Sequence, residues 1–252
     1  MERRRKENPM GKKNKPSKAL KKKLKEVGNP AIIFSFDGTI MDTEPAIFAT
    51  YRHMFSKFGK GRRFGTDEEE KVIGQSSVRM LKEFFPKEDP DEMLKEFRMY
   101  QSFHLSDLIQ PMPGVKDFLK WLRENNYPVG IISSRNRSTI INMLEHTGLA
   151  HYIDVIIASS SKDHEYTGTE SLYMASDLLK KKCCIYIGHT PTHITNGHLV
   201  GAFTIAYNSN PKMLYDIIEA GPDFVTADYK EIKKLLRSEP LWVAYEIMKP
   251  QE

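Results

Sequence analysis

The fold of this chain is decided by the stretch Ala31-Ile32-Ile33-Phe34-Ser35-Phe36-Asp37-Gly38-Thr39. An apolar run stops there abruptly at an acidic turn that contains a glycine. A buried strand of a parallel sheet delivers a polar loop to the end of the sheet in this way. We therefore predict a central strand over residues 31–34 and a functional loop over residues 35–39.

Downstream of this stretch, apolar strands alternate with amphipathic helices. The predicted strands cover residues 127–134, 155–158, 183–187 and 202–206. The predicted helices cover residues 118–122, 139–146 and 171–179, and a further helix lies between the strands 183–187 and 202–206. Such alternation is typical of a parallel sheet with helices on both faces, and it places a site at the carboxyl ends of the strands. The predicted fold class is α/β with a Rossmann-like parallel sheet core.

The segment between the first and second strands has a helical period instead. Apolar stripes run over residues 45–58 and 67–105, and the breaker cluster Gln110-Pro111-Met112-Pro113-Gly114 then returns the chain to the sheet. These stripes predict small amphipathic helices packed on one another. We interpret residues 45–110 as an α-helical cap inserted into the core.

The stretch Ser35-Phe36-Asp37-Gly38-Thr39, followed by Asp42-Thr43-Glu44-Pro45, resembles the first motif of the haloacid dehalogenase superfamily. The resemblance covers residues 31–237 and is nearest to the phosphoglycolate phosphatase and β-phosphoglucomutase branch, which has a helical cap after the first strand. It implies a core of residues 29–44 and 111–237 and a cap of residues 45–110. Outside it we expect a basic tail of residues 1–28 and a C-terminal extension of residues 238–252.

The resemblance assigns roles to the two polar residues of the first motif. In the family the first aspartate attacks phosphorus, the second acts as general acid and base, and both help to hold Mg²⁺. Here Ser35 replaces the nucleophile and Asp37 keeps the acid/base position. A neutral hydroxyl needs a base to become a nucleophile and gives a hard cation no anionic ligand, so this substitution counts against the family reaction.

The second and third motifs of the family bind and neutralise phosphate. A strand ending in a hydroxyl residue matches the second motif at Ser133, with Ser134 next to it, and we expect these two residues and Thr39 to bind an anion. Thr167 stands where the family has a lysine, although a loop of different length could deliver Lys162. We treat the lysine motif as absent.

The fourth motif of the family is Gly-Asp followed four residues later by a second Asp. This chain has Gly188 and then His189 and His193, so two imidazoles replace both carboxylates. Mg²⁺ prefers oxygen ligands. We therefore expect no cofactor, and Mg²⁺ only if the chain is an active enzyme; a softer metal on the two histidines and Asp37 is a weaker alternative.

These changes affect four catalytic positions at three places in the sequence. General acid/base help alone contributes about 10²–10⁴-fold, far less than phosphate-ester hydrolysis requires. The main expectation is therefore a protein that has lost phosphatase activity and acts as a binding or regulatory scaffold. The alternative is a divergent phosphohydrolase that acts on a small phosphate ester through Ser35 or water.

Charge is distributed unevenly along the chain. Residues 1–28 carry twelve Lys or Arg and three Glu, a net charge of +9, which leaves −4 for the rest of the total of +5. We expect this tail to lack a stable fold and either to serve solubility alone or to bind RNA, a ribosomal particle or another acidic surface. A small phosphorylated ligand is the other expected partner.

The apolar residues and the cysteines indicate the cellular compartment in which we expect the protein. No run approaches the roughly 20 apolar residues of a membrane span, and the tail lacks the apolar segment of a secretory signal. The two cysteines, Cys183 and Cys184, are adjacent in an apolar run, which favours buried thiols. We expect a cytoplasmic protein, with a nuclear or organellar address left open.

Overall fold

The computed structural model describes residues 28–73, 75–104, 108–159, 168–181, 184–207 and 213–238. Their elements follow the chain in this order: β1 (Ala31–Ser35), β2 (Met41–Asp42), α2 (Glu44–Phe58), α3 (Thr66–Val72), α4 (Ser77–Phe84), α5 (Pro90–His104), β3 (Gln110–Pro111), α6 (Val115–Glu124), β4 (Val129–Asn136), α7 (Arg137–His146), η2 (Ala150–Tyr152), β5 (Val155–Ser159), α8 (Thr169–Leu178), β6 (Cys184–Gly188), α9 (Pro191–Leu199), β7 (Phe203–Tyr207), α10 (Leu214–Glu219), β8 (Phe224–Thr226) and α11 (Tyr229–Ser238).

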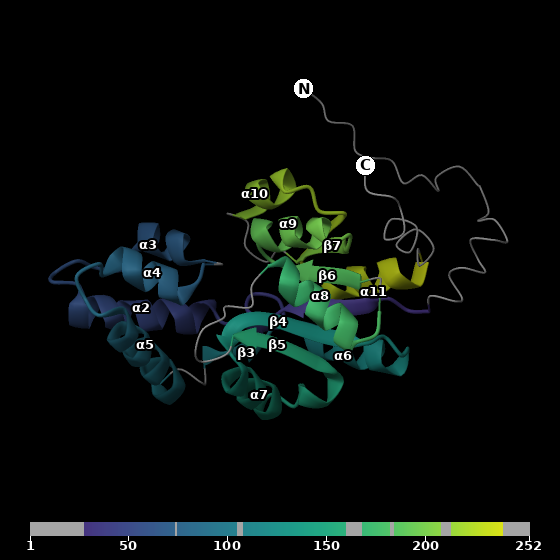
Figure 1. Ribbon diagram of the computed structural model, residues 1–252, viewed down its shortest axis with the longest axis horizontal. Coiled ribbons are helices and arrows are strands. Elements are labelled where there is room, and N and C mark those ends of the chain that lie inside the picture. The colour runs from purple at the N-terminus through teal and green to yellow at the C-terminus, as the bar shows by residue number, and fades with distance from the viewer. Residues whose placement is uncertain are drawn as a thin grey trace, which may run out of the picture.

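A six-stranded sheet with the order β5-β4-β1-β6-β7-β8 forms the centre of the molecule, and all its pairs are parallel (Figure 1). All five residues of β1 are buried because neighbouring strands and helices surround it. The expected Rossmann-like α/β core is therefore confirmed. Since the strands are parallel, the residues that follow β1, β4 and β6 meet at one edge of the sheet.

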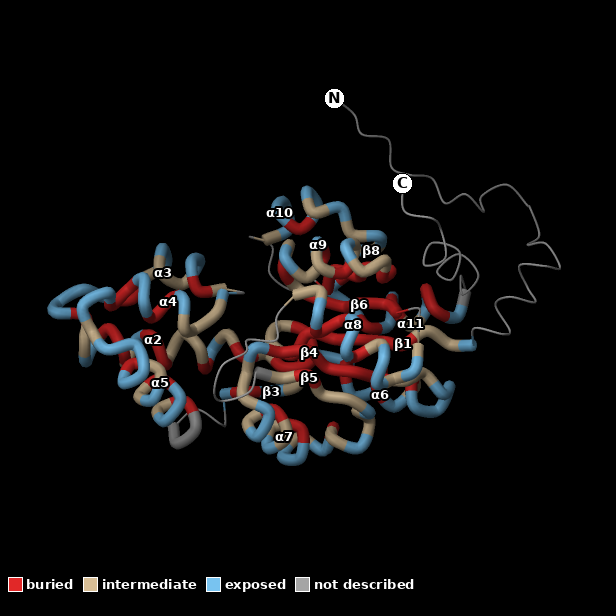
Figure 2. The backbone as a smooth tube through the Cα atoms, in the orientation of Figure 1, coloured by how far each residue is buried: buried red, intermediate tan, exposed pale blue. Residues whose placement is uncertain are grey.

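Helices cover both faces of the sheet, and alternate residues of each strand pack against one side or the other. On one face, Ile32 and Phe34 share a core with α6, α7 and α11. On the other face, Ala31 and Ile33 pack with Leu172 of α8. The strands lie in the buried interior between these helices (Figure 2). This support on both sides holds the polar ends of the strands in place.

The helices α2 to α5, which we call the helical insert, pack around an interior of their own. Tyr51 stacks on Phe64 with ring centroids 5.4 Å apart, and Phe55, Phe84 and Phe97 belong to the same cluster. The chain enters and leaves the insert through the antiparallel pair β2–β3. We keep as our proposal the division into cap and core at residues 45 and 110, which this separate interior supports.

The structure adds elements that the sequence pattern did not indicate. The strand β8 and the helices α10 and α11 follow β7, where no element was assigned. The strand expected over residues 183–187 is described as Cys184–Gly188, with Cys184 buried as a free thiol. No helix within the described ranges is both long and apolar enough to cross a membrane. Three parts of the chain named above lie outside the described residues. They are residues 1–27, most of the extension 238–252, and position 167, which was compared with the family lysine.

Candidate active site

The loop after β1 is tightly folded. The backbone N–H of Gly38 donates to the Met41 carbonyl at 2.8 Å, and the Tyr229 hydroxyl donates to the Thr39 carbonyl at 2.6 Å. Gly38 has a φ of +61°, a left-handed conformation in which a side chain is strained. A Cβ at this position would also lie 2.7 Å from His189 Cδ2. The glycine therefore allows the loop to lie directly against the histidine.

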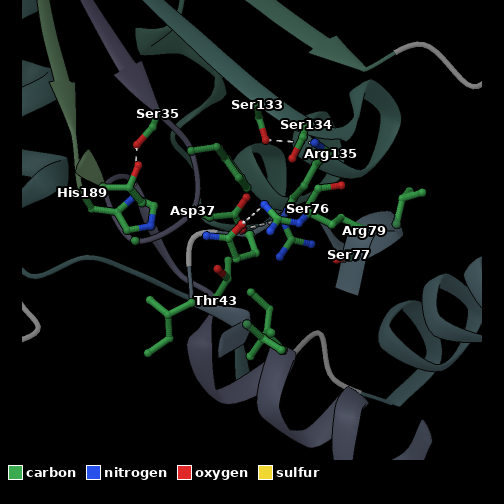
Figure 3. Close-up of a pocket in the computed structure, with 18 of the residues that line it drawn as sticks. Ser35, Asp37, Thr43, Ser76, Ser77, Arg79, Ser133, Ser134, Arg135 and His189 are labelled. Carbon is green, nitrogen blue, oxygen red and sulfur yellow. Dashed lines mark hydrogen bonds and ion pairs between the residues drawn. The ribbon is translucent and has the colours of Figure 1, made fainter. Parts of the chain in front are cut away.

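A cavity of about 600 Å³ opens between this loop and the helical insert. Its sheet side carries Ser35, Asp37, Ser133, Ser134 and Arg135, and its insert side carries Ser76, Ser77, Arg79, Arg98 and Gln101. Figure 3 shows the labelled residues of both sides directed toward the same space. The lining combines hydroxyls with arginines, which is a lining suited to a small anion.

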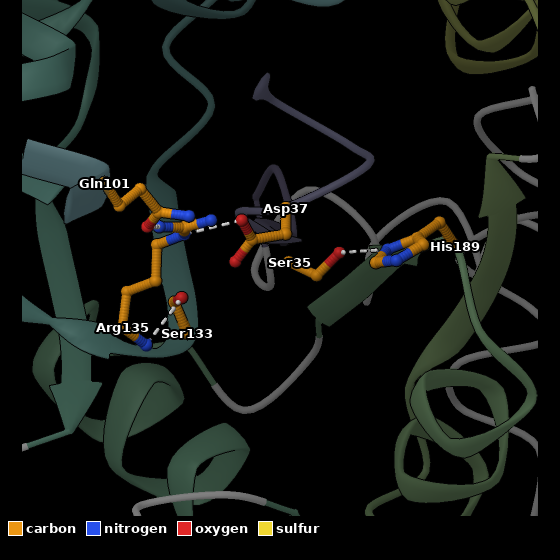
Figure 4. A network of polar contacts seen from close by, with 6 residues as sticks. All are labelled: Ser35, Asp37, Gln101, Ser133, Arg135 and His189. Atoms are coloured by element: carbon orange, nitrogen blue, oxygen red, sulfur yellow. Dashed lines mark hydrogen bonds and ion pairs between the residues drawn. The ribbon is translucent and has the colours of Figure 1, made fainter. Parts of the chain in front are cut away.

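Arg135 is the central cation of the cavity. Its Nε donates to Asp37 Oδ1 at 2.6 Å, and its Nη1 donates to Gln101 Oε1 at 2.7 Å (Figure 4). The side chain is 13% exposed and that of Asp37 is 27% exposed, so water screens this ion pair only in part. Arg135 thus links β4 both to the loop after β1 and to helix α5 of the insert.

Sequence reasoning missed the role of Arg135 and Gln101. Arg135 directly follows the strand-end residues Ser133 and Ser134 but was given no role, and Gln101 lies inside the zone 67–105 that was assigned to packed helices. The available signal was the position of Arg135 two residues after Ser133, at the predicted carboxyl end of a strand. Its partners are 98 and 34 residues away in the chain, so only the fold could identify them.

Ser35 and Thr39 form a buried pair behind the cavity surface. The two hydroxyl oxygens are 2.7 Å apart, and either residue could be the donor. The Ser35 hydroxyl is also 3.4 Å from His189 Nδ1. Ser35 reaches the cavity lining, whereas the fully buried Thr39 is not among the lining residues. The structure therefore places Thr39 as a support for Ser35, which differs from the expected direct contact with an anion.

The other two residues expected to bind an anion, Ser133 and Ser134, both line the cavity. The Ser133 hydroxyl accepts a hydrogen bond from the backbone N–H of Arg135 at 3.1 Å, which fixes the turn after the strand end. Ser134 is exposed. Their assignment to anion binding stays a prediction, and their position next to Arg135 favours it.

The two histidines that replace the family carboxylates lie at the start of α9. Pro191 is the first residue of this helix and Thr190 is its N-cap. The Thr190 hydroxyl accepts from the His193 backbone N–H at 3.2 Å, and His193 Nδ1 accepts from the His189 backbone N–H at 3.3 Å. The second bond fixes the His193 imidazole against the backbone of His189, whose own ring lies directly against Gly38.

Both imidazoles are neutral near pH 7. Burial lowers the pKa of His189 to about 4, against the opposing effect of the Asp37 charge. Burial also lowers the pKa of His193 to about 3, and the His189 ring adds to this shift. Neither ring therefore carries a positive charge near pH 7 that would attract a phosphate.

This pair gives a testable pH dependence of stability. Because both pKa values are lower in the folded chain than the ordinary 6.5, the unfolded chain binds protons first as the pH falls. The free energy of unfolding should therefore decrease from about pH 6.5 toward pH 4. Both residues keep some exposed surface, so we discount the effect to about 1 kcal/mol for each histidine between pH 7.5 and pH 5. Urea unfolding at the two pH values measures it.

A double variant, His189→Gln with His193→Gln, should lose this part of the pH dependence. The matched control is His146→Gln, which removes an exposed histidine and should keep the wild-type difference between the two pH values. A double variant with the same pH dependence as the wild type would show that these rings do not carry it.

The donor set does not fit Mg²⁺, the ion that this fold implies. Asp37 supplies the carboxylate, but it is paired with Arg135, and Ser35, His189 and His193 offer neutral atoms. In the described part of the chain, no three His, Cys, Asp or Glu side chains gather into a group that could hold a metal ion. The weaker expectation of a softer metal on the two histidines and Asp37 finds no such group either.

Two buried polar atoms of the site lack a hydrogen-bond partner among the described residues. They are Gln101 Nε2 and Thr43 Oγ1, and both residues line the cavity. An orphaned buried donor is unfavourable by about 1–3 kcal/mol unless water or a ligand satisfies it. The cavity therefore offers unused hydrogen-bonding capacity where the insert meets the core.

Comparison with known proteins gives one family for most of the chain. A family model described as haloacid dehalogenase-like hydrolase matches residues 32–207. The pyrophosphatase PpaX of Listeria monocytogenes serotype 4b (strain CLIP80459) is 28% identical over 210 residues, which cover 82% of this chain and 96% of that protein.

Solved structures show the same fold. A haloacid dehalogenase-like family hydrolase from Streptococcus pneumoniae superposes with a TM-score of 0.73 at 20% identity, covering 82% of this chain and 98% of that one. A predicted phosphoglycolate phosphatase from Haemophilus somnus 129PT gives a TM-score of 0.67 at 18% identity, with 82% and 97% covered. The resemblance inferred from the first motif is thus confirmed.

Proposed function

The chain belongs to the haloacid dehalogenase-like hydrolase family, and on this premise we propose that it is a phosphohydrolase acting on a small phosphate ester. In this proposal Arg135 binds the phosphoryl group in place of a metal ion, and Asp37 transfers protons. The observation that carries the proposal is the Arg135 guanidinium held 2.6 Å from Asp37 inside a cavity rimmed by strand-end hydroxyls.

The main functional expectation from the sequence, a scaffold without phosphatase activity, is wrong. It is contradicted by the relative named as a pyrophosphatase, whose match covers 82% of this chain, and by the structural neighbour described as a predicted phosphoglycolate phosphatase. These findings support the alternative instead. The expectation failed because it equated the loss of Mg²⁺ ligands with the loss of the reaction, without a view of the arginine that lies in the same site.

Arg135 has the donors for this task. A guanidinium carries five N–H groups in a planar fork that matches phosphate oxygens, and within the described residues two of them are used, one by Asp37 and one by Gln101. The remaining donors and the neighbouring Ser133 and Ser134 can contact a phosphoryl group. A fixed positive charge that water screens only in part stabilises the charge on the phosphoryl oxygens as the ester bond breaks.

Asp37 supplies the acid/base function. In the overall reaction the oxygen of water becomes bonded to phosphorus, and the ester P–O bond breaks. The proton lost by water ends on the departing alcohol oxygen, and Asp37 transfers it. The carboxylate lines the cavity beside the arginine, so it is close to the bound phosphoryl group.

The rest of the ester faces the helical insert. The insert side of the cavity carries Arg79 and Arg98. It also carries Gln101, whose Nε2 is a donor without an acceptor among the described residues. We therefore propose a polar or anionic leaving group, and we include inorganic pyrophosphate among the test substrates because a relative is named for it.

The test is phosphate release by the full chain from a panel of phosphomonoesters and pyrophosphate, with EDTA and with Mg²⁺ in parallel. We expect turnover that persists in EDTA, since the donor set does not fit the ion. Asp37→Asn should lower kcat by at least about 100-fold, because the amide cannot take a proton.

The matched control is Asp177→Asn, which changes an exposed aspartate of α8 outside the cavity and should keep the wild-type rate. Circular dichroism of each variant verifies the fold. The proposal fails if the wild-type chain releases no phosphate under any condition, or if Asp37→Asn turns over as fast as the control.

A further inference from the structure

The Ser35 hydroxyl lies at the position from which a nucleophile reaches the cavity. It sits at the end of the central strand β1 and lines the cavity, although the residue as a whole is only 3% exposed. Thr39 Oγ1 at 2.7 Å can donate to it, and this leaves the Ser35 proton free to point to His189 Nδ1 at 3.4 Å. The side chains of Thr39, Ser35 and His189 then form a series of hydrogen bonds in which the Ser35 O–H bond is polarised toward His189.

His189 is held in the orientation that this contact requires. Its ring packs against Gly38, where there is no room for a Cβ, and its backbone N–H is bonded to His193 Nδ1. The ring is neutral near pH 7 because burial lowers its pKa to about 4. A neutral imidazole whose Nδ1 carries no proton accepts a hydrogen bond at that atom. A separation of 3.4 Å is long, but catalytic hydrogen bonds are often long before substrate binds.

Asp37 is engaged elsewhere. Its Oδ1 accepts from Arg135 Nε at 2.6 Å, and in Figure 4 its carboxylate is directed to Arg135 while the Ser35 hydroxyl is directed to His189. The two proton acceptors of the site therefore serve different partners. His189 faces the serine, and Asp37 faces the arginine where the phosphoryl group would bind.

We propose that Ser35 and His189 form a nucleophile and base pair, so that hydrolysis proceeds through a phosphoserine at position 35. The proposal rests on the proposed phosphohydrolase function. As the bond from Ser35 Oγ to phosphorus forms, the ester P–O bond breaks; the Ser35 hydroxyl proton moves to His189 Nδ1, and Asp37 gives the departing oxygen a proton that it took from water in the previous turnover. In the second step water attacks phosphorus, Asp37 takes a proton from it, the Oγ–P bond breaks, and His189 returns its proton to Ser35 Oγ.

The experiment uses the full chain and p-nitrophenyl phosphate, with acid quenching at times shorter than one turnover. We expect a burst of nitrophenol and a phosphorylated peptide containing Ser35, since a phosphoserine survives acid. Ser35→Ala should remove that peptide and lower kcat by about 10³-fold or more, since loss of a nucleophilic serine can reduce kcat by about 10⁶-fold. His189→Gln should slow the burst without changing its final amplitude, and should remove the acidic limb of its pH profile.

The matched controls are Ser176→Ala and His146→Gln, both outside the cavity, and both should keep the wild-type burst. Thermal unfolding of each variant verifies its fold. Phosphate release with no phosphorylated Ser35, and with Ser35→Ala as fast as its control, would overturn the pair and leave the proposed hydrolysis standing. Phosphorylated Ser35 without phosphate release would support the pair and overturn the hydrolysis.

Discussion

Arg135→Ala should lower kcat/KM for a phosphomonoester by about 10³–10⁵-fold, the range known for arginines that stabilise the transition state of phosphoryl transfer. The effect is expected to be this large because, in the proposed function, the guanidinium next to Asp37 supplies the positive charge that binds the phosphoryl group. Affinity for inorganic phosphate, measured by isothermal titration calorimetry, should fall with it. Steady-state kinetics in EDTA gives the size of the loss.

Two further variants make this result specific. Arg135→Lys keeps the charge but loses the planar fork, so it should recover only part of the activity. Arg123→Ala also removes an arginine paired with a carboxylate, that of Asp154 at 2.9 Å, but this pair lies outside the cavity and the variant should keep wild-type kinetics. Equal losses in Arg135→Ala and Arg123→Ala would mean that the effect comes from stability and not from the site.

Gly38→Ala should lower the free energy of unfolding by about 2–5 kcal/mol. A left-handed conformation is unfavourable for alanine by roughly 1–2 kcal/mol, and overpacking typically adds about 1–3 kcal/mol. Both effects apply, since φ is +61° and the new Cβ would lie 2.7 Å from the His189 ring. Urea unfolding at pH 7.5 measures the change.

The matched control is Gly65→Ala, at the N-cap of α3. The backbone there has a φ of −118°, and the nearest atom to a Cβ is Glu68 Oε2 at 3.6 Å, which is ordinary contact. We expect a change below about 1 kcal/mol at this position. If the two variants unfold at the same urea concentration, the loop after β1 tolerates a side chain and the packing argument for His189 fails.

The sequence was sufficient for the fold because the signal is local there. An uninterrupted apolar run followed at once by Asp37 and Gly38 already specifies a buried parallel strand and a loop at its end. The strand β8 was missed because three residues, Phe224–Thr226, are too short to show a period. Its place at the edge of the sheet depends on pairing with β7, which is a tertiary contact.

The site was only partly predictable, for a related reason. Ser35, Asp37, Ser133 and His189 could be named because each follows a recognisable strand. The ion pair between Asp37 and Arg135 could not be predicted from the sequence, because the two residues become neighbours only when β4 lies beside β1. Removal of carboxylates was visible in the sequence, whereas the cation next to the remaining one was visible only in three dimensions.

The short antiparallel pair β2–β3 has a consequence for how this site can diversify. Met41 pairs with Pro111 and Asp42 pairs with Gln110, so the two ends of the excursion through residues 43–109 are fastened side by side. The distance between these two ends in the core is therefore set by the β2–β3 pair and does not depend on the length or sequence of residues 43–109. In the proposed function the leaving group faces that excursion, whereas Asp37 and Ser133 lie outside it. Substitutions within residues 43–109 would then change which leaving group is selected without moving Asp37 or Ser133.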